Sequence, residues 1–118
     1  MTIKRIVPNI SSNKLNESKE FYTTFLGLTL AMDMQWILTF VSDSNPTAQI
    51  SIVHNNGSDN LNVNITLSIE VSDVDKLYEK AKSMNYEIIY ELTDEPWGVR
   101  RFFVKDPNGV VINLMMHV

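Results

Sequence analysis

The chain has no cysteine, few glycines and no long apolar segment, and each shortage excludes a class of protein. Without cysteine it can form no disulfide, no thiolate metal site and no cysteine nucleophile. Four glycines in 118 residues leave no phosphate-binding loop, nucleotide fingerprint or nucleophile elbow. No stretch approaches the roughly 20 apolar residues of a membrane span, and residues 1–8 lack the apolar run of a signal peptide. We therefore expect a cytoplasmic protein with no membrane partner.

Positive charge is also in short supply. The sequence has 10 Lys and Arg against 14 Asp and Glu, and its only adjacent basic pairs are Lys4-Arg5 and Arg100-Arg101. Nucleic-acid binding requires clustered Lys and Arg, so no nucleic-acid partner is expected. The length and the hydrophobic content of 44% predict a single globular domain over residues 1–118.

The clearest pattern lies between Leu61 and Val71, where apolar residues fill every odd position and polar residues every even one. This period of two predicts a strand with one apolar and one polar face. Helical spacing of apolar residues follows at once, from Val74 to Met84. A helix after a strand usually covers the apolar face, so the polar face is left for solvent or for a ligand cavity.

The strand–helix pattern occurs twice, and three strand-like runs follow each copy. The sequence therefore predicts an α+β fold of two βαβββ modules, about 1–56 and 60–118, with an Asn-rich linker at Asn55–Asn60. A single α+β sandwich without internal symmetry is the alternative. The expected strands are 3–10, 29–34, 36–41 and 48–54, then 61–71, 87–92, 99–105 and 110–116, and the expected helices are 15–26 and 74–84.

Local signals set the expected helix boundaries and turns. Short polar side chains cap helix N-termini, and Gly or Asn in a left-handed conformation ends helices. Asp94-Glu95, a carboxylate pair before Pro96, is expected in a loop and solvated. The boundary candidates are Ser12 or Asn13 and Gly27 for the first helix, and Ser72 or Asp73 and Asn85 for the second.

Three stretches carry a family resemblance that covers essentially the whole chain. They are Ser18–Leu28, Glu70–Tyr78 and Trp97–Gly109, the last with a Trp-Gly-x-Arg start and an Asp-Pro-Asn-Gly turn. The chain resembles the vicinal oxygen chelate superfamily of glyoxalases, bleomycin resistance proteins and extradiol dioxygenases, and in particular its bleomycin-resistance branch. The resemblance implies paired modules whose sheets curl around a ligand-binding cup, with the helices outside.

The resemblance also implies where a metal would be held, on the first and last strands of each module. Those positions fall at Val7, Ser51, Thr66 and Asn113. Valine cannot bind a metal, and neutral oxygens only supplement carboxylates around hard cations. Transition metals require imidazole, thiolate or carboxylate. We therefore expect no metal and no cofactor, although a displaced site built from His54, Glu70 and His117 remains an alternative to exposed strand-end residues.

The expected activity is capture of a small molecule, such as a drug or metabolite, in a cup at a homodimer interface, with no catalytic residue. A metal-dependent lyase, isomerase or dioxygenase of the same superfamily, or a scaffold with a vestigial cup, are the rival hypotheses. Trp97 has an alternative role as a structural plug of its hairpin, Trp36 as core or interface, and Glu70 as an ion-pair partner of Arg5 or Arg100. The candidate ligand-binding residues are Trp36, Trp97, Asn9, Ser51, Thr66, Ser68, Glu70, Tyr90, Asn113 and Met115.

Overall fold

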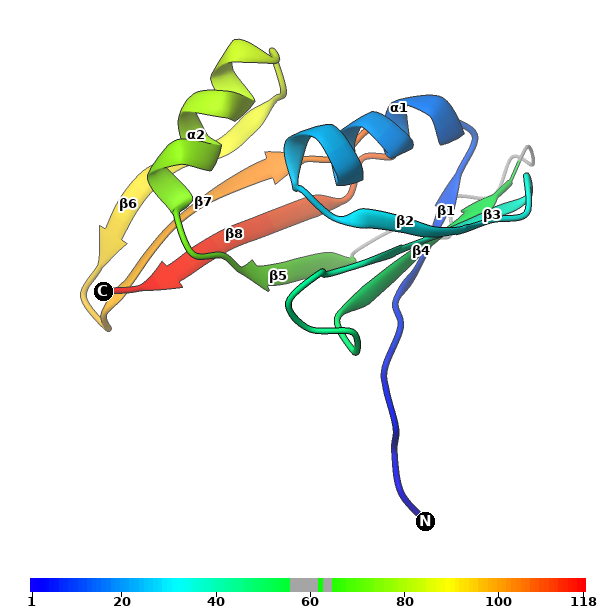
Figure 1. The fold of residues 1–118 in the computed structure, drawn as a ribbon. Coiled ribbons are helices and arrows are strands. Elements are labelled where there is room, and N and C mark those ends of the chain that lie inside the picture. Colours follow the sequence, from blue (N-terminus) through cyan, green and yellow to red (C-terminus); the bar gives the residue numbers. More distant parts are fainter. Residues whose placement is uncertain (56–61, 63–64) are drawn as a thin grey trace. The chain divides into compact units, whose positions relative to one another are not determined.

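The computed structural model describes residues 1–55, 62 and 65–118, and divides the chain into two compact units, Met1–Asn62 and Val63–Val118. Each unit holds a four-stranded mixed sheet and helical segments, so the prediction of two βαβββ modules in an α+β fold is confirmed (Figure 1). Most of the predicted linker and the first part of the strand predicted at 61–71 lie outside the described residues.

The first unit orders its strands β1-β4-β3-β2, with β1 and β4 parallel and the other pairs antiparallel. Its helical segment packs on one face of this sheet, where Phe21, Tyr22 and Phe25 are buried with Phe40. The elements are β1 (Asn9–Ser12), α1 (Leu15–Lys19), the π-helix η1 (Glu20–Phe25), β2 (Thr29–Asp33), β3 (Ile37–Val41) and β4 (Gln49–His54).

The helical segment covers the predicted residues, but its second half has π geometry. Ser18 and Thr23 donate their hydroxyl protons to the carbonyls of Lys14 and Lys19, and such back-bonds bend helices. Gly27 ends the segment with a φ of 80°, as predicted. The predicted N-cap is wrong: Lys14 occupies that position without a side-chain cap.

The N-terminal strand is shorter than the prediction of 3–10. β1 begins at Asn9, opposite Ser51 of β4 and directly after Pro8, which has no backbone N–H to donate to the ladder. Among the described residues before Asn9, the carbonyl of Pro8 accepts a hydrogen bond from the backbone N–H of Ser51, and Ile6 forms an isolated bridge to Ala48. Val7 therefore lies outside a strand.

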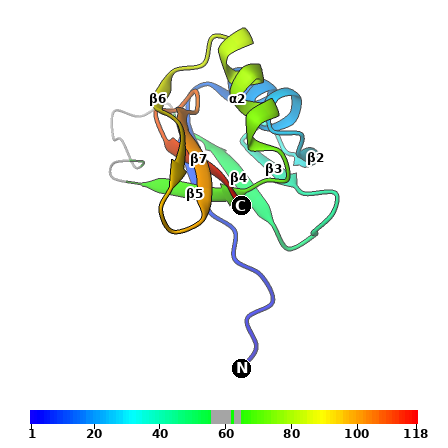
Figure 2. The same ribbon diagram turned by 90° about the vertical axis from the view of Figure 1, so that its left-hand side faces the viewer.

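The second unit orders its strands β5-β8-β7-β6, with β5 and β8 parallel. Figure 2 shows β6 and β7 side by side as an antiparallel hairpin. The helix α2 packs on one face of the sheet, where Tyr78 makes an edge contact with Phe102. The elements are β5 (Thr66–Glu70), α2 (Val74–Ser83), β6 (Ile88–Glu95), β7 (Val99–Lys105) and β8 (Val111–His117).

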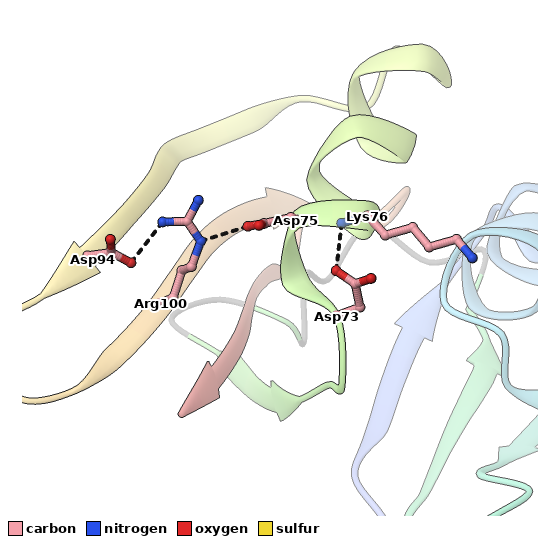
Figure 3. A network of polar contacts seen from close by, with 5 residues as sticks. All are labelled: Asp73, Asp75, Lys76, Asp94 and Arg100. Atoms are coloured by element: carbon pink, nitrogen blue, oxygen red, sulfur yellow. Dashed lines mark hydrogen bonds and ion pairs between the residues drawn. The ribbon is translucent and has the colours of Figure 1, made fainter. Parts of the chain in front are cut away.

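The N-terminus of α2 is fixed by two acidic residues (Figure 3). The carboxylate of Asp73 caps the helix by accepting a hydrogen bond from the backbone N–H of Lys76 at 3.1 Å, which confirms one of the two predicted caps. Asp75, on the first turn, pairs with Arg100 of β7 at 2.6 Å, and Arg100 also pairs with Asp94 of β6 at 2.8 Å. One guanidinium thus ties the helix to two strands.

The ends of α2 and the last hairpin follow the predicted turn chemistry. Asn85 has a φ of 60° just after the helix. In the Asp-Pro-Asn-Gly turn the carboxylate of Asp106 accepts hydrogen bonds from the backbone N–H groups of Asn108 and Val110, and Gly109 has a φ of 84°. This turn sets the register that places β8 beside β7.

No helix within the described residues is long and apolar enough to serve as a membrane span.

Candidate functional site

The second sheet has a helix-covered face and an opposite face, which we call the distal face. Along β7, Phe102 and Val104 are buried on the helix side, so Arg101 and Phe103 project to the distal side. Along β5 the even residues are more exposed than the odd ones, as the alternation predicted. The distal face is formed by Thr66, Ser68, Glu70, Tyr90, Glu95, Arg101, Phe103, Asn113, Met115 and His117.

Strand register arranges these side chains in two rows across the sheet. Tyr90, Phe103, Asn113 and Ser68 are consecutive cross-strand partners and form the first row. Arg101, Met115 and Glu70 form the second. With strands about 4.8 Å apart, the first row extends over roughly 14 Å, which is the length of a small organic ligand.

An arginine among aromatic rings occupies one end of the distal face. The guanidinium carbon of Arg101 lies 4.9 Å from the ring centre of Phe103, 5.3 Å from that of Trp97 and 5.6 Å from that of Tyr90. Tyr90 and Phe103 also contact each other, with ring centres 4.9 Å apart. Cation–π contacts of this kind hold a guanidinium in place.

A carboxylate completes this cluster. Glu95 accepts a hydrogen bond from the Tyr90 hydroxyl at 2.8 Å and from Nη2 of Arg101 at 3.0 Å. The Glu95 side chain is only 8% exposed and that of Arg101 24%. The predicted loop is therefore wrong, because Asp94 and Glu95 both lie in β6, with their side chains bound to arginines on opposite faces of the sheet. Solvation is confirmed for Asp94, whose side chain is 65% exposed, and is wrong for Glu95.

The other end of the distal face is polar. Nδ2 of Asn113 donates a hydrogen bond to the Ser68 hydroxyl at 3.1 Å, and the Glu70 carboxylate lies 3.0 Å from Nδ1 of His117. Glu70 thus pairs with His117, not with Arg5 or Arg100: Arg5 binds Gln49, and Arg100 binds Asp75 and Asp94. Both members of the Glu70–His117 pair are about two-thirds exposed, at 63% and 66%.

The face of the first sheet opposite α1 and η1 repeats the arrangement with different chemistry. Asn9, Ser51, Thr39 and Met32 are consecutive cross-strand partners, and the hydroxyls of Thr39 and Ser51 lie 2.9 Å apart. Ser51 is 4% exposed. This row has no aromatic ring, so the aromatic surface of the candidate site belongs to the second unit.

The irregularities of the two sheets also correspond. Register shifts by one residue between Leu30 and Met32 of β2 and between Ile88 and Tyr90 of β6. Each shift is a β-bulge that re-aims the following side chain. Met32 is thereby placed at the end of the Asn9–Ser51–Thr39 row of the first sheet, and Tyr90 at the end of the first row of the second sheet.

The predicted site residues fall into two groups. Ser68, Glu70, Tyr90, Asn113 and Met115 share the distal face of the second sheet. Thr66 lies on the same face but opposite Val111, outside the two rows. Trp97 belongs to the β6–β7 turn and is 63% exposed, and its indole faces Arg101. Asn9 and Ser51 belong to the first unit, as does Trp36, which is 58% exposed beside β3.

The residues at the metal positions expected from the resemblance do not fit a metal. Register places Asn9 opposite Ser51 and Ser68 opposite Asn113, whereas Val7 lies outside a strand and Thr66 is opposite Val111. All four paired side chains are neutral amides or hydroxyls, which are poor ligands for transition metals. Among the described residues no three His, Cys, Asp or Glu form a group that could hold an ion, and Glu70 and His117 provide only two donors.

Sequence reasoning did not identify Arg101, Glu95 and Phe103 as members of the site. Period-two spacing from the buried Phe102 and Val104 would have placed Arg101 and Phe103 together on the free face. No spacing pattern in the sequence identifies Glu95. Its contacts with Tyr90 and Arg101 depend on the bulges that shift the register between β6 and β7.

Family comparison agrees with this geometry. The profile of the Glyoxalase/Bleomycin resistance protein/Dioxygenase superfamily matches residues 2–114. The chain therefore belongs to this superfamily. No curated protein matches it.

Solved structures share the fold at low sequence identity. TioX from Micromonospora sp. ML1 has a TM-score of 0.78 at 15% identity, with 98% of this chain and 100% of that chain covered. A putative glyoxalase family protein from Bacillus anthracis has a TM-score of 0.77 at 17% identity, with coverages of 100% and 98%. A bleomycin resistance determinant encoded on the transposon Tn5 has a TM-score of 0.75 at 17% identity, with 98% of each chain covered.

Proposed function

We propose that this protein binds a small molecule on the distal face of its second sheet, without a metal ion and without changing it chemically. The observation that carries the proposal is the pair of rows across that face. One end has rings for stacking and the other has amide, hydroxyl and carboxylate groups. Small-molecule sites combine apolar surface with a few placed polar groups in this way.

We propose binding without a reaction because of the side chains that occupy the positions of the metal ligands. A family enzyme needs metal ligands on the paired strands, and here those positions hold Asn9, Ser51, Ser68 and Asn113. The neutral side chains of Ser51, Ser68 and Asn113 already hydrogen-bond to neighbours on the same sheet. The similarity to the Tn5 bleomycin resistance determinant supports capture of a drug or metabolite as the physiological role.

Two further elements belong to this proposal. We expect a cytoplasmic homodimer in which a second copy completes the ligand-binding cup. Sedimentation velocity tests the stoichiometry, and a monomer at micromolar concentration would contradict the dimer alone.

Tryptophan fluorescence tests ligand binding. Bleomycin and a panel of neutral and cationic bicyclic aromatics are titrated into the protein and into Trp97→Phe and Trp36→Phe variants. We expect a bound compound to change the emission of the wild type and of Trp36→Phe, because Trp97 lies beside the proposed site. A signal that survives in Trp97→Phe and is lost in Trp36→Phe would place the site in the first unit. No response to any compound at millimolar concentration would refute the proposal.

A metal-dependent enzyme is the second candidate, and the Glu70–His117 pair is the observation that favours it. Two donors on one exposed face can begin a site but do not complete one. Equilibrium dialysis with nickel, zinc, manganese and ferrous iron separates the two candidates. One tightly held equivalent per chain, lost in Glu70→Gln, would support the enzyme and contradict metal-free binding.

A further inference from the structure

We propose that the distal face recognises a neutral planar lactam, meaning a cyclic amide with adjacent carbonyl and N–H groups, through Nε of Arg101 and Oδ1 of Asn113. This inference rests on the proposed function and names the chemical class of its ligand.

Two buried polar atoms on this face lack hydrogen-bond partners in the part of the chain that the structure describes. They are Nε of Arg101, a donor, and Oδ1 of Asn113, an acceptor. Buried polar groups are nearly always paired, and an unpaired one is costly in a folded protein. Each residue uses its other polar atoms, since Arg101 binds Glu95 and Asn113 binds Ser68. The unpaired atoms can therefore each form one more hydrogen bond, and they belong to side chains that are already held in place.

The two atoms come from neighbouring positions. Arg101 is the cross-strand partner of Met115, and Asn113 is two residues from Met115 on the same face of β8. The two residues are therefore diagonal neighbours across β7 and β8, a separation that long side chains can bridge. Phe103, the direct partner of Asn113, adds an aromatic ring next to both. Because both atoms are buried, a flat ligand that stacks on this ring must displace the side chains covering them before its edge forms both hydrogen bonds.

The charge balance favours a neutral ligand at this end of the face. The Arg101 guanidinium is paired with the buried Glu95 carboxylate at 3.0 Å, so the cluster offers no net charge to an anion or a cation. Its guanidinium also lies over the Trp97 ring, which disfavours a second cation on the same indole. A ligand group with one acceptor and one donor therefore matches the unpaired donor Nε of Arg101 and the unpaired acceptor Oδ1 of Asn113.

The experiment compares three planar probes. Carbostyril is a bicyclic lactam with both groups, N-methylcarbostyril retains only the carbonyl, and quinoline has neither a carbonyl nor an N–H. Titrations are followed by ¹H–¹⁵N correlation spectra, which report the Nε–H of Arg101 and the side-chain amide of Asn113. We expect carbostyril to shift both signals and to bind about tenfold more tightly than N-methylcarbostyril, as the loss of one hydrogen bond to a buried group predicts.

Variants test each contact. In Asn113→Leu the acceptor is gone, so we expect the two lactams to bind equally, whereas the matched variant Asn16→Leu, at an exposed position of α1, retains the tenfold difference. In Arg101→Lys a cation still faces Glu95 but no Nε–H remains, so N-methylcarbostyril should bind no better than quinoline, whereas carbostyril keeps its N–H bond to Asn113 and remains tighter than quinoline. Far-UV circular dichroism checks that each variant is folded, and either variant alone can decide the result.

The outcomes separate this inference from the proposed function. If all three probes bind equally and move only the Trp97 indole signal, the face binds planar molecules and the lactam assignment is wrong. If carbostyril binds but leaves the Arg101 and Asn113 signals in place, the assignment of these two atoms is wrong. If neither these probes nor the compounds of the fluorescence panel bind, the proposed function fails with it.

Discussion

Replacing Glu95 with Gln should destabilise the second unit, because this carboxylate is the shared acceptor of Tyr90 and Arg101. Hydrogen bonds to a charged group contribute roughly 1.5–3 kcal/mol each, and neutral ones about 0.5–1.5 kcal/mol. Glutamine has nearly the same shape and retains neutral hydrogen bonds. The loss is therefore about 1 kcal/mol for each of the two contacts, or about 2 kcal/mol in the free energy of unfolding.

The corresponding change in melting temperature can be worked out from the chain length. At about 2.1 cal/mol/K per residue, the 118 residues give an unfolding entropy near 0.25 kcal/mol/K. A loss of about 2 kcal/mol then lowers the melting temperature by roughly 8 °C. Thermal and urea unfolding followed by far-UV circular dichroism measure both quantities.

The matched control is Glu91→Gln, because Glu91 is exposed on the same strand. The same chemical change there should alter the free energy of unfolding by less than about 0.5 kcal/mol. A double-mutant cycle with Tyr90→Phe adds a second criterion, since residues in one hydrogen-bond network give non-additive effects. Glu95→Gln as stable as Glu91→Gln, or strict additivity with Tyr90→Phe, would refute the view that Glu95 organises the cluster.

Three further predictions concern the scaffold. Lys19 and the backbone N–H of Gln35 hold the pKa of Asp33 below its ordinary value of 3.8. The contribution of Asp33 to stability is therefore present above that value and is lost as the pH falls through the lower, folded-state pKa. A carbon-13 titration should give a higher Asp33 pKa in Lys19→Met than in the wild type, because only the hydrogen bond from Gln35 then remains. Gly98, with a φ of 88°, should lose about 1 kcal/mol in Gly98→Ala, measured by urea unfolding. Phe102→Ala, in the core under α2, should lose about 3–5 kcal/mol in the same assay, and a loss below 1 kcal/mol would contradict the core assignment.

Local signals account for what the sequence predicted of the fold. Alternation along β5, the Asp73 cap, and the left-handed Gly27 and Asn85 depend only on neighbours in the chain, and all four are present. The first strand was predicted too long because Pro8 interrupts the ladder: proline has no backbone N–H to donate, and β1 begins at the next residue. That the two units together form one domain stays a prediction.

The candidate site was less predictable than the fold for a physical reason. Asn113 was identified from the family resemblance and Tyr90 as an aromatic candidate for the ligand-binding face. Their neighbours Glu95 and Arg101 depend on cross-strand register. Register in β6 is shifted twice by bulges, which no local pattern in the sequence announces. The ligand-binding role of these residues stays a prediction until a compound is bound.

The bulges in β2 and β6 have a consequence for how such a protein can change its specificity. The backbone path at each bulge fixes which residue lies at the end of the row. That residue is Met32 in the first sheet and Tyr90 in the second. The direction of the side chain is therefore set by the backbone, and its chemical character by the residue type at that position. A single substitution at position 32 or 90 can therefore exchange a flexible methionine contact for aromatic stacking, or the reverse, without a change in the backbone path.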